Sequence, residues 1–210
     1  MSTRLEPRWP ASLALVVCAG LYVPLSNRLV VGPRWLLPAL VVLPLIPLSL
    51  RWRHAEGAKW ARYLAISLVA LITLTNVVSL ILLINRVFYA TNVIGRGLLY
   101  SAASIWATNV IVFGLWFWEL DRGGPHIRAG GDARGPDLQF PQMAAATYDA
   151  QKWHPRFFDY LYTSFANGTS FAPADAMPLS GQMKALFGAE ALISFTTIVI
   201  IAGEAVNILR

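Results

Sequence analysis

The sequence predicts an all-α, polytopic membrane helix bundle with about five transmembrane helices. Of the 210 residues, 56% are hydrophobic and 13% are charged, whereas soluble domains carry about 25% charged residues. The charged residues lie between apolar runs and do not alternate with them, so the predicted helices lack the polar faces of a water-soluble bundle. The alternating ten-residue strands of an outer-membrane barrel are not found.

Five apolar segments are predicted to span a bilayer, because a spanning helix needs about 20 mostly apolar residues. They are Trp9–Leu25, Trp35–Leu50, Tyr63–Ile84, Leu98–Leu120 and Met183–Leu209. The second segment is short and contains Pro38, Pro44 and Pro47. For that segment a kinked span and a half-inserted segment are both open.

These segments divide the chain into three regions. Residues 1–120 form a predicted four-helix membrane region, residues 121–154 a polar, exposed loop rich in Gly and Pro, and residues 155–210 a short helix with the last span. The net charge is +6, and the basic residues flank the apolar runs, so the expected partner is the lipid bilayer. Most basic residues lie on the side of the 121–154 loop, which favours a cytoplasmic loop. A channel-like arrangement would require the opposite orientation, with this loop outside, so both orientations are open.

Several function classes are disfavoured by the residue types. The lone Cys18 excludes an internal disulfide, and the three histidines, His54, His126 and His154, lack metal-ligand spacing. No nucleophile–base pair, phosphate-binding glycine loop or nucleic-acid module stands out. We therefore expect no enzyme activity, no cofactor and no nucleic-acid partner.

One segment before the last span differs from a plain helix bundle. Residues 156–166 carry apolar side chains at positions i, i+3, i+4 and i+7, the pattern of a short amphipathic helix: Phe158, Leu161, Tyr162 and Phe165. This run is too short to cross a bilayer, and polar and helix-breaking residues follow it. The order of short helix, polar turn and long apolar helix predicts a re-entrant loop. An interfacial helix with a linker outside the membrane is the open alternative.

The same segment matches a known pattern, D-A-L-Y-F-S-F-V-T-L-T-T-V-G-Y-G-D-I-x-P-V-S, followed by a basic residue and L-E-A-L. The matching residues are Asp159, Leu161, Tyr162, Ser164, Phe165, Thr169, Asp175, Pro178, Ser180, Lys184, Glu190, Ala191 and Leu192. About a quarter of the chain thereby resembles the pore helix, selectivity filter and inner helix of bacterial potassium channels. The resemblance implies a pore-loop fold, monovalent cations as partners, and a homo-oligomer that is a tetramer if it forms a pore.

The chain departs from this pattern at the filter itself. Where the channels read T-V-G-Y-G-D, this chain reads Ser170, Phe171, Ala172, Pro173, Ala174 and Asp175. Both glycines are replaced, and glycine is what allows a positive φ at low cost. Pro173 also lacks an amide hydrogen. A ring of backbone carbonyls of the usual potassium-filter shape is therefore not expected, and we predict a non-standard constriction from Thr169 to Asp175.

The chain as a whole is also similar to an uncharacterised bacterial integral membrane family, of a kind described only as domains of unknown function. The similarity includes WELDRGGP at Trp118–Pro125 and FANGTSFAPADAMPLS at Phe165–Ser180. It implies a pore-loop relative in the bacterial inner (plasma) membrane.

Two acidic residues of the last span are predicted to support the pore-like segment. An ionisable group in a spanning helix is costly and usually faces protein or water. Glu190 either accepts hydrogen bonds from Thr169 or Ser170 and braces the loop, or acts on an ion directly. Glu204 either has a role inside the membrane or reaches the membrane interface.

Three polar residues of the pore-like segment complete the predicted site. Asp159 is carried over from the channel pattern as a supporting residue. Asn167, together with Thr169, is predicted to line a polar constriction. Asp175 is predicted to form a ring of carboxylates if four chains assemble, and a local turn accepting backbone amides is the open alternative.

Polar residues of the third and fourth spans are predicted to form hydrogen bonds between helices. They are Asn76, Asn92 and Asn109, with the hydroxyls of Thr73 and Thr75. Two functions are compatible with the whole sequence. The first is an ion-channel-like pore-loop protein that conducts cations through a non-standard filter, and the alternative is a non-conducting membrane scaffold or accessory protein that retains a pore-loop fold.

Overall fold

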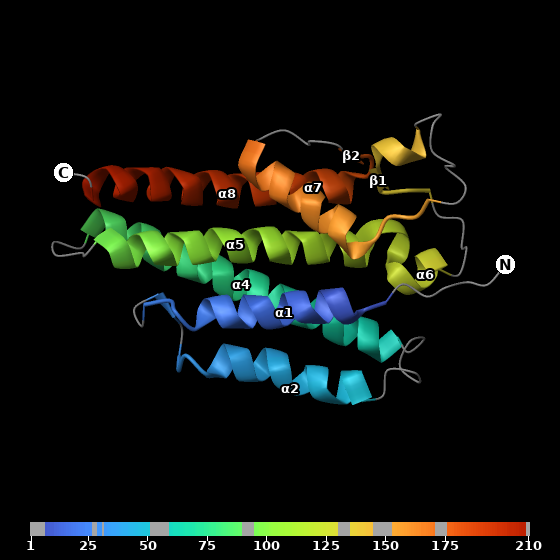
Figure 1. Cartoon of the computed structure of the whole chain (residues 1–210), viewed down its shortest axis with the longest axis horizontal. Helices are drawn as coiled ribbons and strands as arrows, with labels where there is room; N and C mark the ends of the chain where they lie inside the picture. The colour runs from blue at the N-terminus through green and yellow to red at the C-terminus, as the bar shows by residue number, and fades with distance from the viewer. Residues whose placement is uncertain are drawn as a thin grey trace.

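The computed structural model describes residues 7–26, 29–30, 32–50, 59–89, 95–129, 135–144, 153–170 and 176–208. They form an elongated helix bundle, as Figure 1 shows. The principal helices are α1 (Trp9–Tyr22), α2 (Leu36–Leu50), α4 (Lys59–Tyr89), α5 (Gly95–Leu120), α7 (Phe157–Ser170) and α8 (Gly181–Ile208). The predicted helical fold class is confirmed.

Three of the five predicted spans are long and apolar enough to cross a membrane. These three helical stretches are Trp60–Tyr89, Arg96–Gly123 and Gly181–Ile208. Helices α1 and α2 have 14 and 15 residues, which at about 1.5 Å per residue gives roughly 21–23 Å, short of a hydrocarbon core of about 30 Å. Pro24 follows α1 closely, and a proline lacks the amide hydrogen that would continue the hydrogen bonds of a helix.

Helix α5 is the centre of the bundle. It packs against α1, α4, α7 and α8, and Figure 1 shows α7 and α8 on one side of it and α1 and α2 on the other. The side chains of Ala102, Ile105, Val112 and Phe117 are completely buried along α5. By contrast, α8 is the least buried of the three long helices and carries a continuous exposed apolar side.

Buried polar side chains join neighbouring helices, as predicted. Asn76 on α4 donates a hydrogen bond to the Ile105 carbonyl on α5, at 3.2 Å. The Trp116 indole on α5 donates to the Thr73 hydroxyl on α4, at 2.9 Å. Thr75 differs, because its hydroxyl donates to carbonyls of its own helix. The prediction for Asn92 lies outside the described residues.

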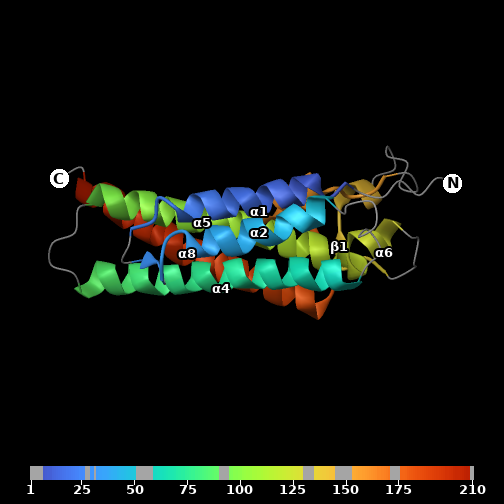
Figure 2. The ribbon, with the colours of Figure 1, turned by 90° about the horizontal axis from the view of Figure 1, so that it is seen from below.

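The region predicted as an exposed loop is partly folded at one end of the bundle. It contains the 3-10 helices η2 (Asp121–Gly123) and η3 (Pro141–Met143), the helix α6 (Pro125–Ala129) and the strand β1 (Leu138–Gln139). Strand β1 pairs antiparallel with β2 (Met177–Pro178), so that Leu138 faces Pro178. Figure 2 shows α6 and β1 at the end of the bundle opposite the C-terminus.

The prediction of an exposed loop was wrong for Leu138 and Phe140, which are both buried. The physical reason is that hydrogen bonds hold β1 against the end of α5. The backbone amides of Asp137 and Leu138 donate to the Asp121 carboxylate, and the Leu179 amide donates to the Asp137 carbonyl at 2.9 Å.

Candidate functional site

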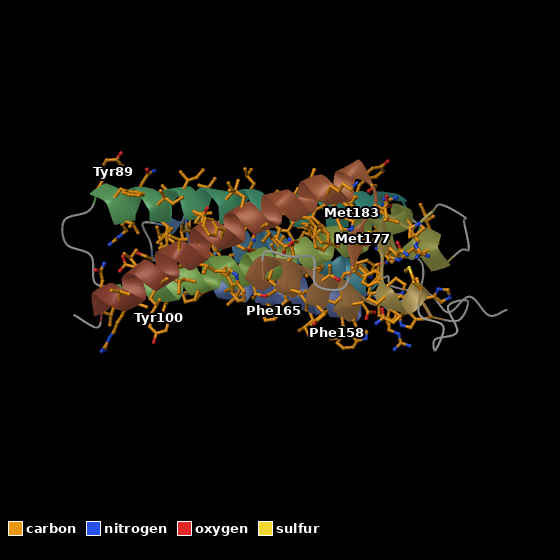
Figure 3. The ribbon with its side chains drawn as sticks, turned by 90° about the horizontal axis from the view of Figure 1, so that it is seen from above. Tyr89, Tyr100, Phe158, Phe165, Met177 and Met183 are labelled. Atoms are coloured by element: carbon orange, nitrogen blue, oxygen red, sulfur yellow. The ribbon has the colours of Figure 1, made fainter. Side chains whose placement is uncertain are left out.

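Helix α7 begins at the end of the bundle that carries β1 and β2 and stops partway along α5 and α8, as Figure 3 shows by the labels Phe158 and Phe165. It has 14 residues, or roughly 21 Å of helix. Helix α8 begins at the same end, because β2 directly precedes it and pairs with β1. The described parts of the segment from the start of α7 to the start of α8 therefore begin and end at the same end of the bundle.

An acidic side chain stabilises the first turn of α7. The Arg156 backbone amide donates a hydrogen bond of 2.6 Å to the carboxylate of Asp159. A free amide at a helix start needs such an acceptor, and an acidic side chain in the first turn also interacts favourably with the helix dipole. Asp159 thus supports the short helix locally.

The exposed side of α7 is aromatic, unlike that of a soluble amphipathic helix. Phe158, Tyr162 and Phe165 are 64%, 55% and 47% exposed. The opposite side, with Ser164 and Asn167, is buried against α5 and α8. Leu161, the fourth residue of the predicted apolar side, instead packs against the core, so the buried side of α7 carries both polar and apolar groups.

A buried carboxyl group on α8 receives two side chains of α7. Glu190 is completely buried. Its Oε1 atom is hydrogen-bonded to the Ser164 hydroxyl, and its Oε2 atom accepts from the Asn167 amide at 2.8 Å. The Ser164 hydroxyl also lies 2.6 Å from the Val110 carbonyl of α5, so these contacts join three helices.

Three further bonds, from two side chains of α5, strengthen this junction. The Asn109 amide on α5 donates to the Glu190 carbonyl at 3.2 Å and to the Ser194 hydroxyl at 2.9 Å. The Trp106 indole of α5 donates to the Gly168 carbonyl near the end of α7, at 3.4 Å. The interhelical role predicted for Asn109 is confirmed, and it links α5 with α8.

Two glycines allow α7 to approach its neighbours closely. A Cβ at Gly114 of α5 would lie 3.0 Å from the Leu161 Cα atom of α7, and a Cβ at Gly168 would lie 3.1 Å from the Ser194 hydroxyl oxygen. Contacts this short require a neighbour to move, and the first involves backbone. The position of α7 therefore depends on small residues on both sides of the interface.

A second buried carboxylate holds the first half of α7. Asp121, at the end of α5, is completely buried. Its Oδ2 atom accepts a hydrogen bond of 2.6 Å from the Tyr160 hydroxyl, and its Oδ1 atom accepts from the Asp137 and Leu138 amides at 3.0 and 3.3 Å. The Arg122 guanidinium lies 3.8 Å from Oδ2.

The turn around Asp121 is shaped by left-handed backbone and a second arginine. Arg122 has φ +53°, which is uncommon for a residue with a side chain, and its amide donates to the Asp137 carboxylate at 2.9 Å. Arg128 donates to the Trp118 and Asp121 carbonyls at 2.7 and 2.9 Å. Its guanidinium also lies 5.1 Å from the centre of the Tyr160 ring.

The structure brings only part of the predicted site together. Glu190 was predicted to accept hydrogen bonds from Thr169 or Ser170, and this was wrong, because its donors are Ser164 and Asn167. These two residues are three positions apart and therefore share one helix side. The Thr169 hydroxyl bonds back to the Phe165 and Ala166 carbonyls of its own helix.

The remaining predicted residues are distributed as follows. Asn167 is buried and donates to Phe187 and Glu190 of α8. Glu204 is buried on the same side of α8 as Glu190, and not exposed at a helix end. Ser170 is the last residue of α7, and Phe171, Ala172, Pro173, Ala174 and Asp175 lie outside the described residues.

Two important residues were missed in the sequence. The sequence patterns single out neither Asp121 nor Tyr160 as a site residue. No local signal could have shown the role of Asp121, because the amides that bind its carboxylate belong to Asp137 and Leu138. Within the described part of the chain, no group of three or more His, Cys, Asp or Glu side chains is placed to hold a metal ion.

Comparison with known proteins adds no relative. No protein-family model, curated protein or solved structure matches this chain. The function is therefore inferred from the geometry of α7 and the helices that hold it.

Proposed function

We propose that this chain is an ion-channel-like pore-loop membrane protein that conducts cations. The observation that carries the proposal is the position of α7, a short helix that starts at the end of the bundle where α8 also starts. A helix of roughly 21 Å cannot cross a hydrocarbon core of about 30 Å. A segment that enters a bilayer to part of its depth and returns to the same side is the arrangement of a pore loop.

The polar bonds on the inner side of α7 support this proposal. Polar groups at membrane depth need partners within the protein. Ser164 and Asn167 have such partners on α5 and α8, and Tyr160 has one at Asp121. With its buried polar groups satisfied and its exposed side aromatic, α7 is suited to lie within the bilayer next to lipid or another copy.

The exposed side of α8 is compatible with assembly around a pore. Leu192, Phe195 and Val199 recur at the spacing of one helix side and are exposed. In a pore-loop channel the last helix faces neighbouring copies, and four copies would bring the turn between α7 and α8 together. In that arrangement Asp175 supplies a ring of negative charge that attracts cations.

The proposal is tested by ion flux into liposomes that contain the purified protein. We expect cation flux above that of empty liposomes and a change in its size or selectivity in Asp175→Asn. Asp159→Asn is the matched control, because Asp159 acts on its own helix start and an asparagine can accept the same amide hydrogen. Flux equal to that of empty liposomes for several cations would contradict conduction.

A non-conducting scaffold or accessory protein is the second candidate. It is favoured by the fact that Ser164 and Asn167 both bond to Glu190 within one chain, which stabilises the fold without any pore. Mass measurement in detergent separates the two functions. A tetramer with cation flux supports the channel, whereas a monomer or dimer without flux supports the scaffold.

A further inference from the structure

The contacts of Ser164 bear on the protonation state of Glu190. The Ser164 hydroxyl lies within hydrogen-bond distance of two oxygen atoms, the Val110 carbonyl and Oε1 of Glu190. A serine hydroxyl has only one hydrogen to donate. One of these two contacts therefore needs a hydrogen from the other partner, and a backbone carbonyl has none.

The two protonation states of Glu190 differ in whether both contacts are satisfied. If Glu190 is ionised, its carboxylate can only accept hydrogen bonds. Ser164 then donates to either Glu190 or the Val110 carbonyl, and the lone pairs of its oxygen face those of the oxygen that receives no hydrogen. With a neutral Glu190, the acid donates to Ser164 and Ser164 donates to the Val110 carbonyl. Asn167 then donates to Oε2, the carbonyl oxygen of the acid. Only the neutral acid satisfies every contact.

The surroundings of Glu190 favour the same state. It is completely buried, and among the described residues no cationic group lies within ion-pair distance of it. An unpaired buried charge is strongly disfavoured. The charged side chains described on α8 and on the helices packed against it are Arg62 and Arg86 on α4, Arg96 and Glu119 on α5, Asp159 on α7, and Lys184 and Glu204 on α8.

We propose that Glu190 is a proton-binding site, held as a neutral carboxylic acid that donates to Ser164 and through it links α8, α7 and the Val110 carbonyl of α5. When Glu190 is deprotonated, its O–H bond breaks and the proton passes to water or hydroxide. Ser164 then turns its own hydrogen to the carboxylate, and the Val110 carbonyl keeps only its hydrogen bond within α5. One of the bonds that attach α7 to α5 thus depends on one proton, whether or not the chain conducts ions.

Infrared spectroscopy of the purified protein tests this site directly. A protonated carboxylic acid has a carbonyl stretching band that a carboxylate lacks. At neutral pH we expect such a band in the wild type, its loss in Glu190→Gln, and its shift to higher frequency in Ser164→Ala, because the acid then loses its acceptor. Glu204→Gln is the matched control on the same helix and should leave the band that responds to Ser164→Ala unchanged.

Each result decides the proposal, even if one variant does not fold. If Glu190→Gln is unfolded, the shift in Ser164→Ala and the disappearance of the same band as the wild type is made alkaline still identify the acid. A wild-type spectrum with no protonated-acid band, or with one that responds only to Glu204→Gln, would overturn it. Ion flux does not enter these measurements, so a failure of the proposed conduction leaves their outcome unchanged.

Discussion

Asp121 and Glu190 are two buried carboxyl groups that hold the same short helix in different ways. Asp121 accepts three hydrogen bonds, from Tyr160, Asp137 and Leu138, and lies near the Arg122 guanidinium. Glu190 is bonded to two side chains, and one of these has a second acceptor to satisfy. The hydrogen-bond partners of Asp121 suit a carboxylate, whereas those of Glu190 suit a neutral acid.

The difference follows from where each residue lies in its helix. Asp121 follows the last residue of α5, next to a turn and a strand whose backbone amides are free to donate. Glu190 lies within α8, where backbone amides already bond along the helix, so only side chains of other helices can reach it. A buried carboxyl group at a helix end can keep its charge more easily than one within a helix.

The largest expected effect is that of Asp121→Asn. The amide group turns one acceptor into a donor and points it at groups that themselves donate. We expect a loss of about 3–5 kcal/mol in the free energy of unfolding, as when one partner of a buried charge is removed. Denaturant titration in detergent measures this loss of stability. Asp159→Asn, in the first turn of α7, is the matched control. An equal, small effect in both variants would contradict the charged role of Asp121.

Tyr160→Phe removes one donor from Asp121 and keeps the aromatic packing on Phe140. A hydrogen bond to a charged group contributes about 1.5–3 kcal/mol, so we expect a loss of about 2 kcal/mol by the same titration. The effect should largely vanish when Asp121→Asn is already present, because the two residues form one interaction. Full additivity of the two losses would contradict the pairing.

Gly114→Ala tests the close approach of α7 between the two carboxyl groups. The added Cβ meets the Leu161 backbone at 3.0 Å, and forced overpacking costs typically about 1–3 kcal/mol. We expect a loss of at least about 1 kcal/mol in thermal or denaturant unfolding. Gly188→Ala on α8 is the matched control, because its Cβ would meet nothing within 4 Å. It should be neutral or stabilising by about 0.5–1 kcal/mol.

The smallest effect at neutral pH is expected for Glu190→Gln. Glutamine can donate to Ser164 and accept from Asn167 as the neutral acid does, so the free energy of unfolding should change by less than about 1 kcal/mol. The wild type should lose stability as the pH rises, because its folded form holds a proton that the unfolded chain releases. Glu190→Gln should lack this dependence, which unfolding measured across neutral and alkaline pH would reveal. A loss as large as that of Asp121→Asn would contradict a neutral Glu190.

Much of the helical architecture could be predicted because it depends on local patterns. The uncharged run in α4 and the long apolar run in α8 specify helices whatever they pack against. The short helix before α8 was visible in its apolar periodicity. For α1 and α2 the apolar composition was read correctly, but their helices are shorter than a full span.

The candidate site was less predictable, because its contacts join distant parts of the chain. Tyr160 and Asp121 are 39 residues apart, and Ser164 and Glu190 are 26 residues apart. Periodicity shows that α7 has two sides but not which side faces protein, since in a bilayer an apolar side is suited to lipid. That choice depended on where Asp121 and Glu190 lie.

The sequence by itself determined that the chain forms apolar helices, with one short amphipathic helix before the last long one. Only the tertiary structure decided that the polar side chains Ser164 and Asn167 lie on the buried side of α7, and that two carboxyl groups hold this helix in place. The physical reason is that helix formation is governed by neighbouring residues, whereas the state of a buried carboxyl group depends on every donor and acceptor that the fold brings to it.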